Sequence, residues 1–434
     1  MNTVNVGLLG LGTVGAGTAE TLLNQRELIR DRSGIDLVLS RAADLNLDRD
    51  FGFPIPREIL TSDAMEVLRD PAIQIIVEMI GGTGIAKTFI LEAFAQGKSV
   101  VTANKALLAE HGPELITAAQ DAGVELFFEA SVGGGIPIIK ALREGLVANP
   151  IEEIHGILNG TCNYILTRME RDGVSFEAVL QEAQSLGYAE AEPSLDIDGW
   201  DTAHKAVILG QLAFGIPVTL EDVSVSGIRD ISPVDVATAA ELGYRIKLLA
   251  ILTRVNGSVE VGVQPALIPV DHMLANVEMS FNAVLVKGSV VGETLYYGRG
   301  AGRLPTASAV VADIVDVARN LISGASDRIP LEWSPEKAPR LLPPAERVER
   351  SYLRLLLRDR PGTLGVVARI LGESGITITA LVQKEEHTHK EFVPVVILTG
   401  TAKVGDVEEA MQRLSALEDV GDSLIRYRVE ELGA

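Results

Sequence analysis

Cysteine is nearly absent from this sequence of 434 residues. Because Cys162 has no second cysteine to pair with, neither an internal disulfide nor a multi-cysteine metal site can form. Histidine is scarce as well: none of the six follows the H-x-x-x-H spacing, and the close pair His387 and His389 is typical of a solvated polar hairpin. The single thiol favours the cytoplasm as the location.

The chain also lacks a long apolar run and an excess of positive charge. It has no stretch of about eighteen apolar residues and no basic-then-apolar leader, so we expect a soluble globular protein without a membrane span. With 38 basic against 59 acidic residues, the formal charge of −21 would repel a phosphate backbone, so nucleic acid is not an expected partner. The length is enough for two or three domains of roughly 150 residues.

A glycine-rich turn near the start of the sequence predicts a dinucleotide site. The stretch "GLLGLGTVGAG" (7–17) contains Gly10, Gly12 and Gly15 in G-x-G-x-x-G spacing. It follows an apolar run and precedes a helical pattern and a second apolar run at 35–44, which is the context that this motif requires. Gly10 would permit the tight turn, Gly12 would let the backbone approach a pyrophosphate, and Gly15 would let the helix pack on the strand.

Strand and helix patterns alternate over the first 135 residues. Apolar runs at 73–80, 98–105 and 124–131 are separated by helical patterns near 86–96 and 111–121. This alternation predicts an α/β domain with a Rossmann-type, doubly wound parallel sheet. Ligands bind at the carboxyl edge of such sheets, where four loops would gather: the glycine turn, Gly81–Gly82, "TANK" (102–105) and "EASVGGGIP" (129–137).

Three further regions follow this first domain (1–135). Residues 136–325 mix helical patterns with antiparallel strand patterns and predict an α+β substrate-binding and dimerisation domain, whose helical stretch 304–322 is expected to complete the first domain. Residues 326–349 are proline-rich and predict a linker. Residues 350–434 follow the order βαββαβ, which is typical of a ferredoxin-like domain.

An acidic stretch, "GYAEAEPSLDIDGWDTAHK" (187–205), indicates the chemistry of the second domain. If a helix begins near residue 199, Asp201 and Lys205 are one turn apart and share a face. The acids could hold a cationic amine while Lys205 exchanges a proton with a hydroxyl or carbonyl, which requires burial or a neighbouring cation such as Lys105 to lower its pKa. A solvated helix surface explains the same pair of residues equally well.

Six motifs occur in order along the chain: "GLGTVG" (10–15), "TANK" (102–105), "EASVGGGIP" (129–137), "ILNGTCNYIL" (157–166), the acidic stretch 187–205, and "GRGAGRLPTASAV" (298–310). Together they resemble the homoserine dehydrogenase family over residues 1–325. The resemblance implies NAD(P)-dependent interconversion of L-homoserine and L-aspartate 4-semialdehyde, a step in threonine, methionine and isoleucine biosynthesis.

The resemblance also implies roles for individual residues. Lys205 would be the proton donor in the reductive direction, Lys105 a catalytic or cofactor-contacting lysine, and Asp201 the residue that orients the substrate and Lys205. Gly187, Glu190 and Asp196 would contact the substrate together with Asp201; many members have two adjacent acids where this chain has Leu195 and Asp196, so only Asp196 receives the role. The residues expected to contact the cofactor are Gly10, Gly12, Thr13, Val14, Gly15, Arg41, Asp44, Gly81, Lys105, Gly160, Gly187 and Gly302.

A monovalent cation, sodium or potassium, is implied as well. Its ligands would be the side chain or backbone of Glu129 and the carbonyl oxygens of Val132, Gly134 and Ile136. An all-oxygen set suits a hard cation.

The choice between NAD and NADP is balanced. Asp44, at the end of the second predicted strand, would bond a ribose 2′-hydroxyl and favour NAD, although it lies farther from Gly15 than the usual roughly 20 residues. Arg41 and Arg49 are near enough in sequence to accept a 2′-phosphate instead. The habit of the family inclines the expectation to NADP.

The C-terminal region resembles an ACT domain, because "DRPGTLG" (359–365) matches the first strand-to-helix turn of that module. The resemblance implies edge-to-edge pairing, an amino-acid effector, expected to be threonine, and a homodimer or homotetramer. A module used only for dimerisation is the alternative.

Two other functions fit parts of the sequence. A 2-hydroxyacid dehydrogenase of the phosphoglycerate type also joins a dinucleotide fold to an ACT module, but it needs a histidine–carboxylate pair and usually carries its glycine motif in mid-chain. An NAD(P)-sensing regulator would have no use for Lys105 together with the cluster from Glu190 to Lys205.

Overall fold

The computed structural model describes residues 2–325, 338–384 and 391–432, which form two compact units. Unit 1 comprises Met1–Glu152, His204–Glu221 and Asn282–Pro339, and unit 2 comprises Glu153–Ala203, Asp222–Phe281 and Arg340–Ala434. The first half of the expected linker (326–337) lies outside the described residues, as does the pair His387 and His389. Among the described residues, no helix is long and apolar enough to cross a membrane.

Unit 1 contains a parallel sheet of six strands in the order β3-β2-β1-β4-β5-β6, and every pairing in it is parallel. This is the strand order of a doubly wound dinucleotide fold, so the predicted fold class is confirmed. The strands are β1 (Asn2–Leu9), β2 (Ile35–Ala43), β3 (Leu60–Thr61), β4 (Ile75–Glu78), β5 (Ser99–Thr102) and β6 (Leu126–Phe127). The helices that follow them are α1 (Thr13–Asn24), α2 (Arg26–Ser33), α3 (Ala64–Leu68), α4 (Gly84–Ala95), α5 (Lys105–Asp121) and α6 (Ile138–Lys140).

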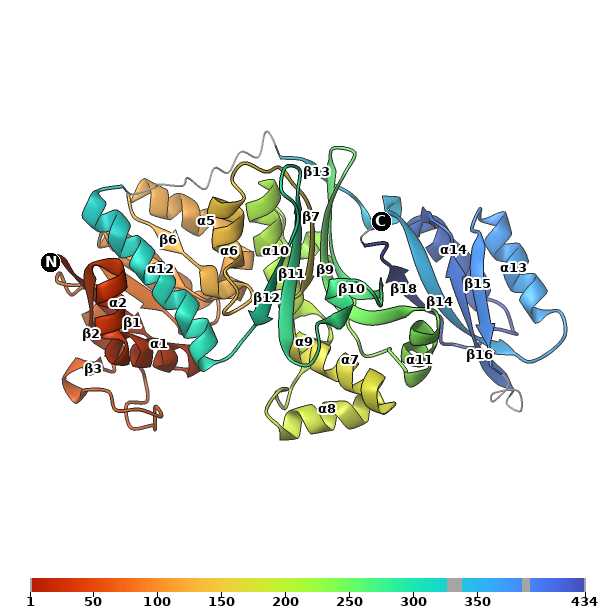
Figure 1. Cartoon of the computed structure of the whole chain (residues 1–434), viewed down its shortest axis with the longest axis horizontal. Coiled ribbons are helices and arrows are strands. Elements are labelled where there is room, and N and C mark those ends of the chain that lie inside the picture. Colours follow the sequence, from red (N-terminus) through yellow and green to blue (C-terminus); the bar gives the residue numbers. More distant parts are fainter. Residues whose placement is uncertain (1, 326–337, 385–390, 433–434) are drawn as a thin grey trace. The chain divides into compact units, whose positions relative to one another are not determined.

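Helix α12 (Arg303–Ser323) belongs to the same unit and lies beside α1 (Figure 1). Its buried residues Val310, Ile314 and Val317 join the apolar core of the parallel sheet. The two helices approach so closely that a Cβ on Gly17 would lie 2.6 Å from the backbone oxygen of Arg303. Unit 1 also includes most of α10 (Trp200–Phe214) and the strands β11 (Phe281–Gly288) and β12 (Gly292–Arg299).

Helix α5 begins six residues earlier than its sequence pattern suggests. The side chain of Asn104 accepts a hydrogen bond from the backbone N–H of Leu107 at 3.2 Å and caps the helix at Lys105. Pro113 lies within the helix, eight residues after its start. The cap therefore places Lys105 in the first turn of α5, directly beyond the carboxyl end of β5.

Unit 2 contains a mixed sheet in which β7 (Ile151–Ile157), β9 (Tyr244–Val255), β10 (Ser258–Pro269), β18 (Ile425–Val429), β14 (Val348–Arg358), β16 (Phe392–Thr399) and β15 (Ile378–Gln383) lie in this order. Short strands β8 (Ser224–Val225), β13 (Arg340–Leu341) and β17 (Ala402–Lys403) pair beside it. Its helices are α7 (Gly160–Asp172), α8 (Phe176–Ser185), α9 (Ser194–Ile197) and α11 (Pro233–Glu241). The long antiparallel pair β9–β10 confirms the strand patterns of this region.

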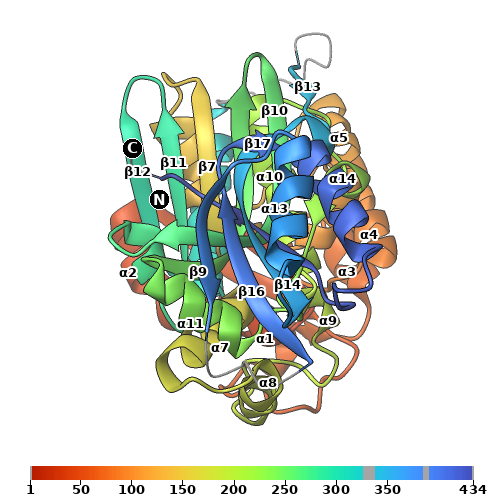
Figure 2. The ribbon, with the colours of Figure 1, turned by 90° about the vertical axis from the view of Figure 1, so that its right-hand side faces the viewer.

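The C-terminal part has the predicted order βαββαβ. Strands β14, β15, β16 and β18 alternate with helices α13 (Thr363–Glu373) and α14 (Val404–Ser415), and the sheet order is β18-β14-β16-β15. Figure 2 shows the two helices side by side against these strands. The apolar core between them is separate from that of unit 1.

The C-terminal strand β18 joins two parts of the unit 2 sheet. It pairs in parallel with β10, opposite Ala266 and Leu267, and antiparallel with β14. Side chains of opposite charge are buried at this seam: Arg428 bonds Glu260 of β10, lies 3.1 Å from Glu349 of β14 and 2.6 Å from Glu430. Burial alone would raise the pKa of Glu430, but Arg428 and His155 lower it to about 2.

Replacement of Arg428 by leucine should strongly destabilise unit 2. The change leaves Glu260, Glu349 and Glu430 buried without their shared cation, which costs about 3–5 kcal/mol of unfolding free energy in comparable cases. Arg413→Leu is the matched control, because its ion pair with Glu373 is exposed and worth at most about 1 kcal/mol. Urea denaturation of the full chain compares the two, and equal losses would contradict a structural role for the seam.

Candidate active site

The glycine turn after β1 has the geometry predicted for a dinucleotide site. Gly10 has φ +89°, and a Cβ there would lie 2.7 Å from the backbone oxygen of Met79. A Cβ on Gly15 would overlap the backbone oxygen of Gly10. By contrast, Gly12 precedes α1, and a Cβ built on it meets nothing within 4 Å. The first backbone N–H groups of α1, including those of Thr13 and Val14, are therefore approachable by an anion.

A pocket of about 500 Å³ adjoins this turn. The carboxylate of Asp44, just after β2, accepts hydrogen bonds from the backbone N–H of Leu11 at 2.6 Å and of Asn46 at 2.9 Å, and so shapes the turn. The guanidinium of Arg49 donates to the Leu11 carbonyl. The pocket is lined by Leu9, Gly10, Gly12, Ala43, Asp44, Leu45, Arg49, Ser62, Asp63, Ala64, Met79, Ile80, Ile85 and Phe89.

Arg41 does not line this pocket. Its guanidinium lies 3.7 Å from Glu66 and 3.5 Å from Asp70, and both of these acids are partly exposed. Of the two arginines that could accept a 2′-phosphate, the structure therefore brings Arg49 to the pocket and leaves Arg41 in surface ion pairs.

A buried acid that the sequence pattern did not single out shapes the loops after β4 and β5. Glu78 is fully buried; one carboxylate oxygen accepts the backbone N–H groups of Ile80 and Gly81, and the other accepts the hydroxyl of Thr102 at 2.7 Å. Asn104 donates its side-chain amide to the Gly82 carbonyl at 2.7 Å. These bonds tie the Gly81–Gly82 loop to the start of α5, where Lys105 lies.

In unit 2, the side-chain amide of Asn159 contacts two acids of the predicted substrate site. The side-chain nitrogen of Asn159 donates to Asp196 at 2.7 Å and to Asp201 at 2.8 Å. Its side-chain oxygen accepts the backbone N–H of Cys162 and caps α7 at Gly160. Asn159 was not among the residues predicted from the sequence, although a polar residue between a strand and a helix is the usual signal of such a cap.

The other predicted substrate residues are placed by the segment between α8 and α10. Gly187 has φ +75° just after α8, and Gln184 holds the Glu190 backbone carbonyl at 3.0 Å while the Glu190 side chain is exposed. Asp196 lies on α9, and Leu195 beside it is 51% exposed. Asp196 bonds Asn159, and its substrate role stays a prediction.

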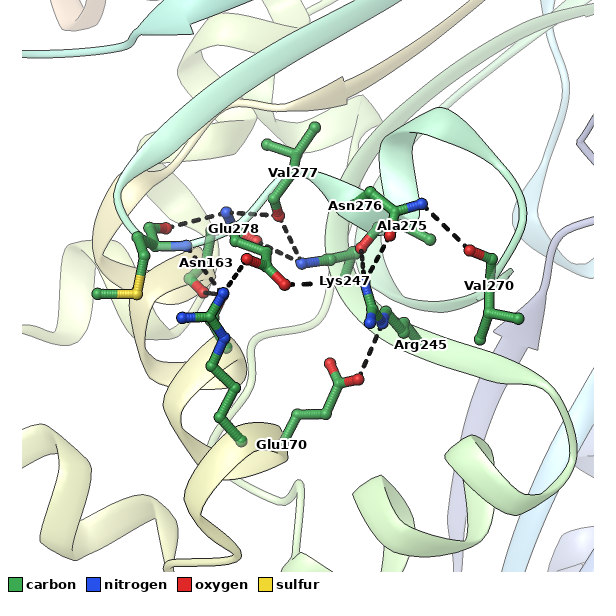
Figure 3. A network of polar contacts seen from close by, with 12 residues as sticks. Asn163, Glu170, Arg245, Lys247, Val270, Ala275, Asn276, Val277 and Glu278 are labelled. Carbon is green, nitrogen blue, oxygen red and sulfur yellow. Dashed lines mark hydrogen bonds and ion pairs between the residues drawn. The ribbon is translucent and has the colours of Figure 1, made fainter.

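Helix α7 is fixed by a buried lysine. Lys247 donates to the side-chain oxygen of Asn163 at 3.1 Å and to the Val277 carbonyl at 2.6 Å (Figure 3). Asn163 in turn donates to the carbonyls of Val277, Met279 and Phe281. Burial lowers the pKa of Lys247 to about 8. Asn163 follows Asn159 by one helical turn, so this network fixes the helix that presents Asn159.

The predicted acid–base pair lies on one helix. Asp201 and Lys205 are one turn apart on α10, and their exposed fractions are 6% and 8%. A solvated helix surface does not agree with this burial.

The predicted cation loop follows β6 in unit 1. The Glu129 carboxylate accepts the backbone N–H groups of Ile139 at 2.9 Å and Lys140 at 2.7 Å. Burial raises the pKa of Glu129 to about 7, which these bonds oppose. Gly134 has φ +55° and packs against Gly300, close to Gly302 at the start of α12.

Among the described residues, no group of three or more His, Cys, Asp or Glu side chains could bind a metal ion, at this loop or elsewhere. A cation at the loop would therefore depend on carbonyl oxygens such as those of Val132 and Gly134. The Ile136 carbonyl already accepts the backbone N–H of Ile138 at 2.8 Å.

The parallel sheet, the open glycine turn and the pocket beside it define a nicotinamide-dinucleotide oxidoreductase. Comparison with known proteins agrees with this class and narrows it. A family model of the homoserine dehydrogenase NAD-binding domain matches residues 10–129, one described as homoserine dehydrogenase matches 137–315, and an ACT domain model matches 351–416.

Relatives match over the full length. A homoserine dehydrogenase of Neisseria gonorrhoeae is 45% identical over 437 residues and covers 100% of both chains. The crystal structure of a homoserine dehydrogenase from Thiobacillus denitrificans has a TM-score of 0.93 at 47% identity, covering 100% of this chain and 99% of that one. A hyperthermophilic archaeal homoserine dehydrogenase in complex with NADPH has a TM-score of 0.63 at 29% identity, covering 73% and 98%.

The chain belongs to the homoserine dehydrogenase family. It is an NAD(P)-dependent oxidoreductase of amino-acid biosynthesis that interconverts L-homoserine and L-aspartate 4-semialdehyde, and it carries a C-terminal ACT domain. The phosphoglycerate-type dehydrogenase and the cofactor-sensing regulator, which the sequence alone left open, do not agree with these matches.

Removal of the Asn159 side chain should raise the KM for homoserine strongly and lower the free energy of unfolding only slightly. Asn159→Ala leaves Asp196 and Asp201 without their shared donor, so we expect the KM for homoserine to rise about tenfold or more. Ser175→Ala removes the cap of α8 without touching these acids and should change KM less than about twofold. Both variants should lose about 1 kcal/mol of stability. Equal KM values would show that Asn159 acts only as a cap.

Proposed function

We propose that Lys205 is the general acid in the reductive direction and the general base in the oxidative direction. The observation that carries this proposal is the burial of Lys205 together with Asp201 on α10, beside which Asn159 holds Asp201 and Asp196. An ammonium group positioned beside the substrate oxygen can donate a proton to it in one direction and accept one in the other. In this scheme Asp201 and Asp196 orient the substrate, and Glu190 binds its amino group.

The cofactor would be held by the turn from Gly10 to Gly15, the pocket beside it and the loop at Gly81. The open N-terminus of α1 and the space above Gly12 fit a pyrophosphate. A bound nicotinamide cofactor supplies or accepts the hydride. Lys105, at the start of α5, would contact the cofactor or the reacting oxygen. Gly160, Gly187 and Gly302 would lie close to the ligands, and a Cβ on Gly187 would meet nothing within 4 Å.

A sodium or potassium ion is proposed at the loop from Glu129 to Ile136. The carbonyl oxygens of Val132 and Gly134 and the backbone of Glu129 form the all-oxygen set that a hard cation prefers. The Glu129 side chain serves the loop differently, by holding the first backbone N–H groups of the next helix.

NADP is the proposed cofactor, and Arg49 is the residue proposed to accept its 2′-phosphate. Arg49 lines the pocket next to Asp44, whose negative charge would favour the free ribose of NAD instead. The preference between NAD and NADP would therefore depend on the balance between the charges of Arg49 and Asp44.

Threonine is proposed as the effector of the ACT domain, and a homodimer or homotetramer as the assembly. Two edge strands support the proposed assembly, because an exposed strand edge can pair with another chain. Strands β12 and β15 lie at the two ends of the strand order of the described residues. Tyr297 on β12 is 56% exposed and Leu381 on β15 is 44% exposed. The cytoplasm remains the proposed location, because a single cysteine needs no oxidising compartment.

Variants of Asp44 and Arg49 should shift cofactor preference in opposite directions. Asp44→Ala loses a ribose acceptor and should weaken NAD more than NADP, whereas Arg49→Gln should weaken NADP more than NAD. Both also lose a contact to Leu11, so the ratio of the KM values for NAD and NADP is the informative quantity. Initial rates with homoserine at 340 nm under each cofactor provide the test, and an unchanged ratio in both variants would remove this pair from the site.

Substitution of Lys205 should depress kcat while cofactor binding persists. A positioned general acid contributes about 10²- to 10⁴-fold in rate, so Lys205→Ala should lose about that factor. Lys205→Arg should not restore activity, because a guanidinium cannot accept a proton in the oxidative direction. Lys105→Ala should also be severe, and the double variant should lose much less than the product of the two effects.

Lys87→Ala is the control for the lysine variants, because Lys87 forms a surface ion pair with Glu114 on unit 1. Its kcat should remain close to that of the unaltered chain. A Lys205→Ala enzyme with near-normal kcat would mean that the proton comes from water or from Lys105.

A further inference from the structure

A buried lysine in unit 2 lies at the centre of a polar network that the proposed chemistry does not use (Figure 3). Lys247, on β9, is 1% exposed, and it donates to the side-chain oxygen of Asn163 and to the carbonyl of Val277. Burial of an ammonium group costs free energy, and an apolar side chain of similar size often gives equal stability in the place of a buried charged group. A lysine at this position therefore points to a role other than stability.

The segment 277–281 wraps around the side chain of Asn163. The amide nitrogen of Asn163 donates to the carbonyl oxygens of the first, third and last residues of this segment, at 3.1, 2.9 and 3.2 Å. Met279, in the middle, has φ +56°, which is unfavourable for a residue with a side chain. Its backbone N–H donates to the hydroxyl of Thr167 at 3.1 Å. Two side chains of α7 therefore hold the segment in a conformation that it would not keep without them.

Charged side chains from α7 and β9 hold the same segment from outside. Glu278 bonds Arg171 of α7 and lies 3.8 Å from Arg245, which precedes Lys247 by two residues and so shares its face of β9. Arg245 lies 2.9 Å from Glu170 of α7. Glu170 and Glu278 raise the pKa of Lys247 against the effect of burial. The segment is therefore fixed between the helix and the strand.

The segment also contacts the first turn of α7. A Cβ on Gly160 would lie 2.9 Å from the backbone oxygen of Ser280, so there is no space between them. Gly160 directly follows Asn159, and the Asn159 carbonyl accepts the backbone N–H of Asn163 at 3.2 Å. A displacement of the segment or of Asn163 therefore moves the backbone of Asn159.

The position of Asn159 has little tolerance, because one amide nitrogen serves two acids. It donates to Asp196 at 2.7 Å and to Asp201 at 2.8 Å. Hydrogen bonds weaken steeply when their distance and angle change, and the two carboxylates repel each other. A small shift of Asn159 therefore weakens at least one of the two bonds and moves the acids apart.

We propose that Lys247 and Asn163 are positioning residues for homoserine recognition, because they hold the segment 277–281 against the first turn of α7 and so keep Asn159 on the two acids. The inference rests on the proposed substrate role of these acids. In this scheme Lys247 acts on homoserine only through α7 and takes no part in proton transfer.

Lys247→Met removes the donor and keeps the length of the side chain. The KM for homoserine should rise about five- to tenfold, whereas the KM for the cofactor should stay within about twofold, because the glycine turn belongs to unit 1. A purely structural loss would lower the active fraction, and hence the apparent kcat, without moving either KM. An unchanged homoserine KM in the folded variant would overturn the proposal.

Lys98→Met is the matched control. Lys98 is also a buried lysine whose pKa is lowered by burial, and it donates to a backbone carbonyl, that of Asp70 in unit 1. The control should lower the melting temperature as Lys247→Met does, and should leave the homoserine KM within about twofold. An equal rise of this KM in both variants would show a general effect of losing a buried lysine and would overturn the proposal.

A double variant tests whether the effect passes through Asn159. In the Asn159→Ala background the two acids have already lost their shared donor, so Lys247→Met should raise the homoserine KM by less than about a further twofold. If the two effects multiply in full, Lys247 acts by a separate route and the proposal is overturned.

Thr167→Val decides the matter if Lys247→Met does not fold. It keeps the shape of the side chain, removes only the acceptor of the Met279 N–H, and should raise the homoserine KM about threefold. An unchanged KM would overturn the proposal.

Asp196→Asn and Asp201→Asn separate this inference from the proposed function. If both leave the homoserine KM unchanged, the proposed substrate role of the acids fails. If they raise it while Lys247→Met and Thr167→Val do not, only the positioning role fails.

Discussion

The pairing of β18 with β10 is the contact on which the organisation of unit 2 depends. It adds the last strand of the C-terminal module to the sheet that carries β7 and β9, and it buries Arg428 among acids of β10 and β14. Buried charges are tolerated only while they remain paired, so the two parts of the sheet are held in one register. An ACT domain that folded independently of the rest of unit 2 would not share a strand pairing and buried ion pairs with it.

The same seam brings the ACT domain and the residues predicted to bind substrate into one folded unit. Helix α11 is locked to the module through Asp235, which accepts bonds from Tyr352 and Arg354 of β14 at 2.8 Å each. The loop before α11 contains Arg229, and this residue clamps α9. A chain of polar contacts therefore runs from β14 to the acids held by Asn159.

Much of the fold was predictable because it rests on local signals. Period-2 and helical patterns gave the α/β class, the long strands β9 and β10, helix α12 and the βαββαβ module, and the glycine spacing gave the dinucleotide turn. Helix α5 starts six residues before the expected helical pattern, because its start is set by the Asn104 cap, a hydrogen bond that forms only in the folded chain. Arg41 was expected near the cofactor because of its position in the sequence. In the structure its guanidinium forms ion pairs with Glu66 and Asp70.

The sequence by itself determined the family, the chemistry of its motifs and the identity of Lys105, Lys205, Asp196 and Asp201 as site candidates, because these depend on residue types at short spacing. Only the tertiary structure decided that Asn159 joins two acids, that Glu78 shapes the loops after β4 and β5, and that Arg428 meets Glu260. The last pair is separated by 168 residues, and Asn159 and Asp201 by 42. Such bonds form only after distant strands and helices have packed, and no local pattern in the chain encodes which polar groups will then lie within 3 Å of one another.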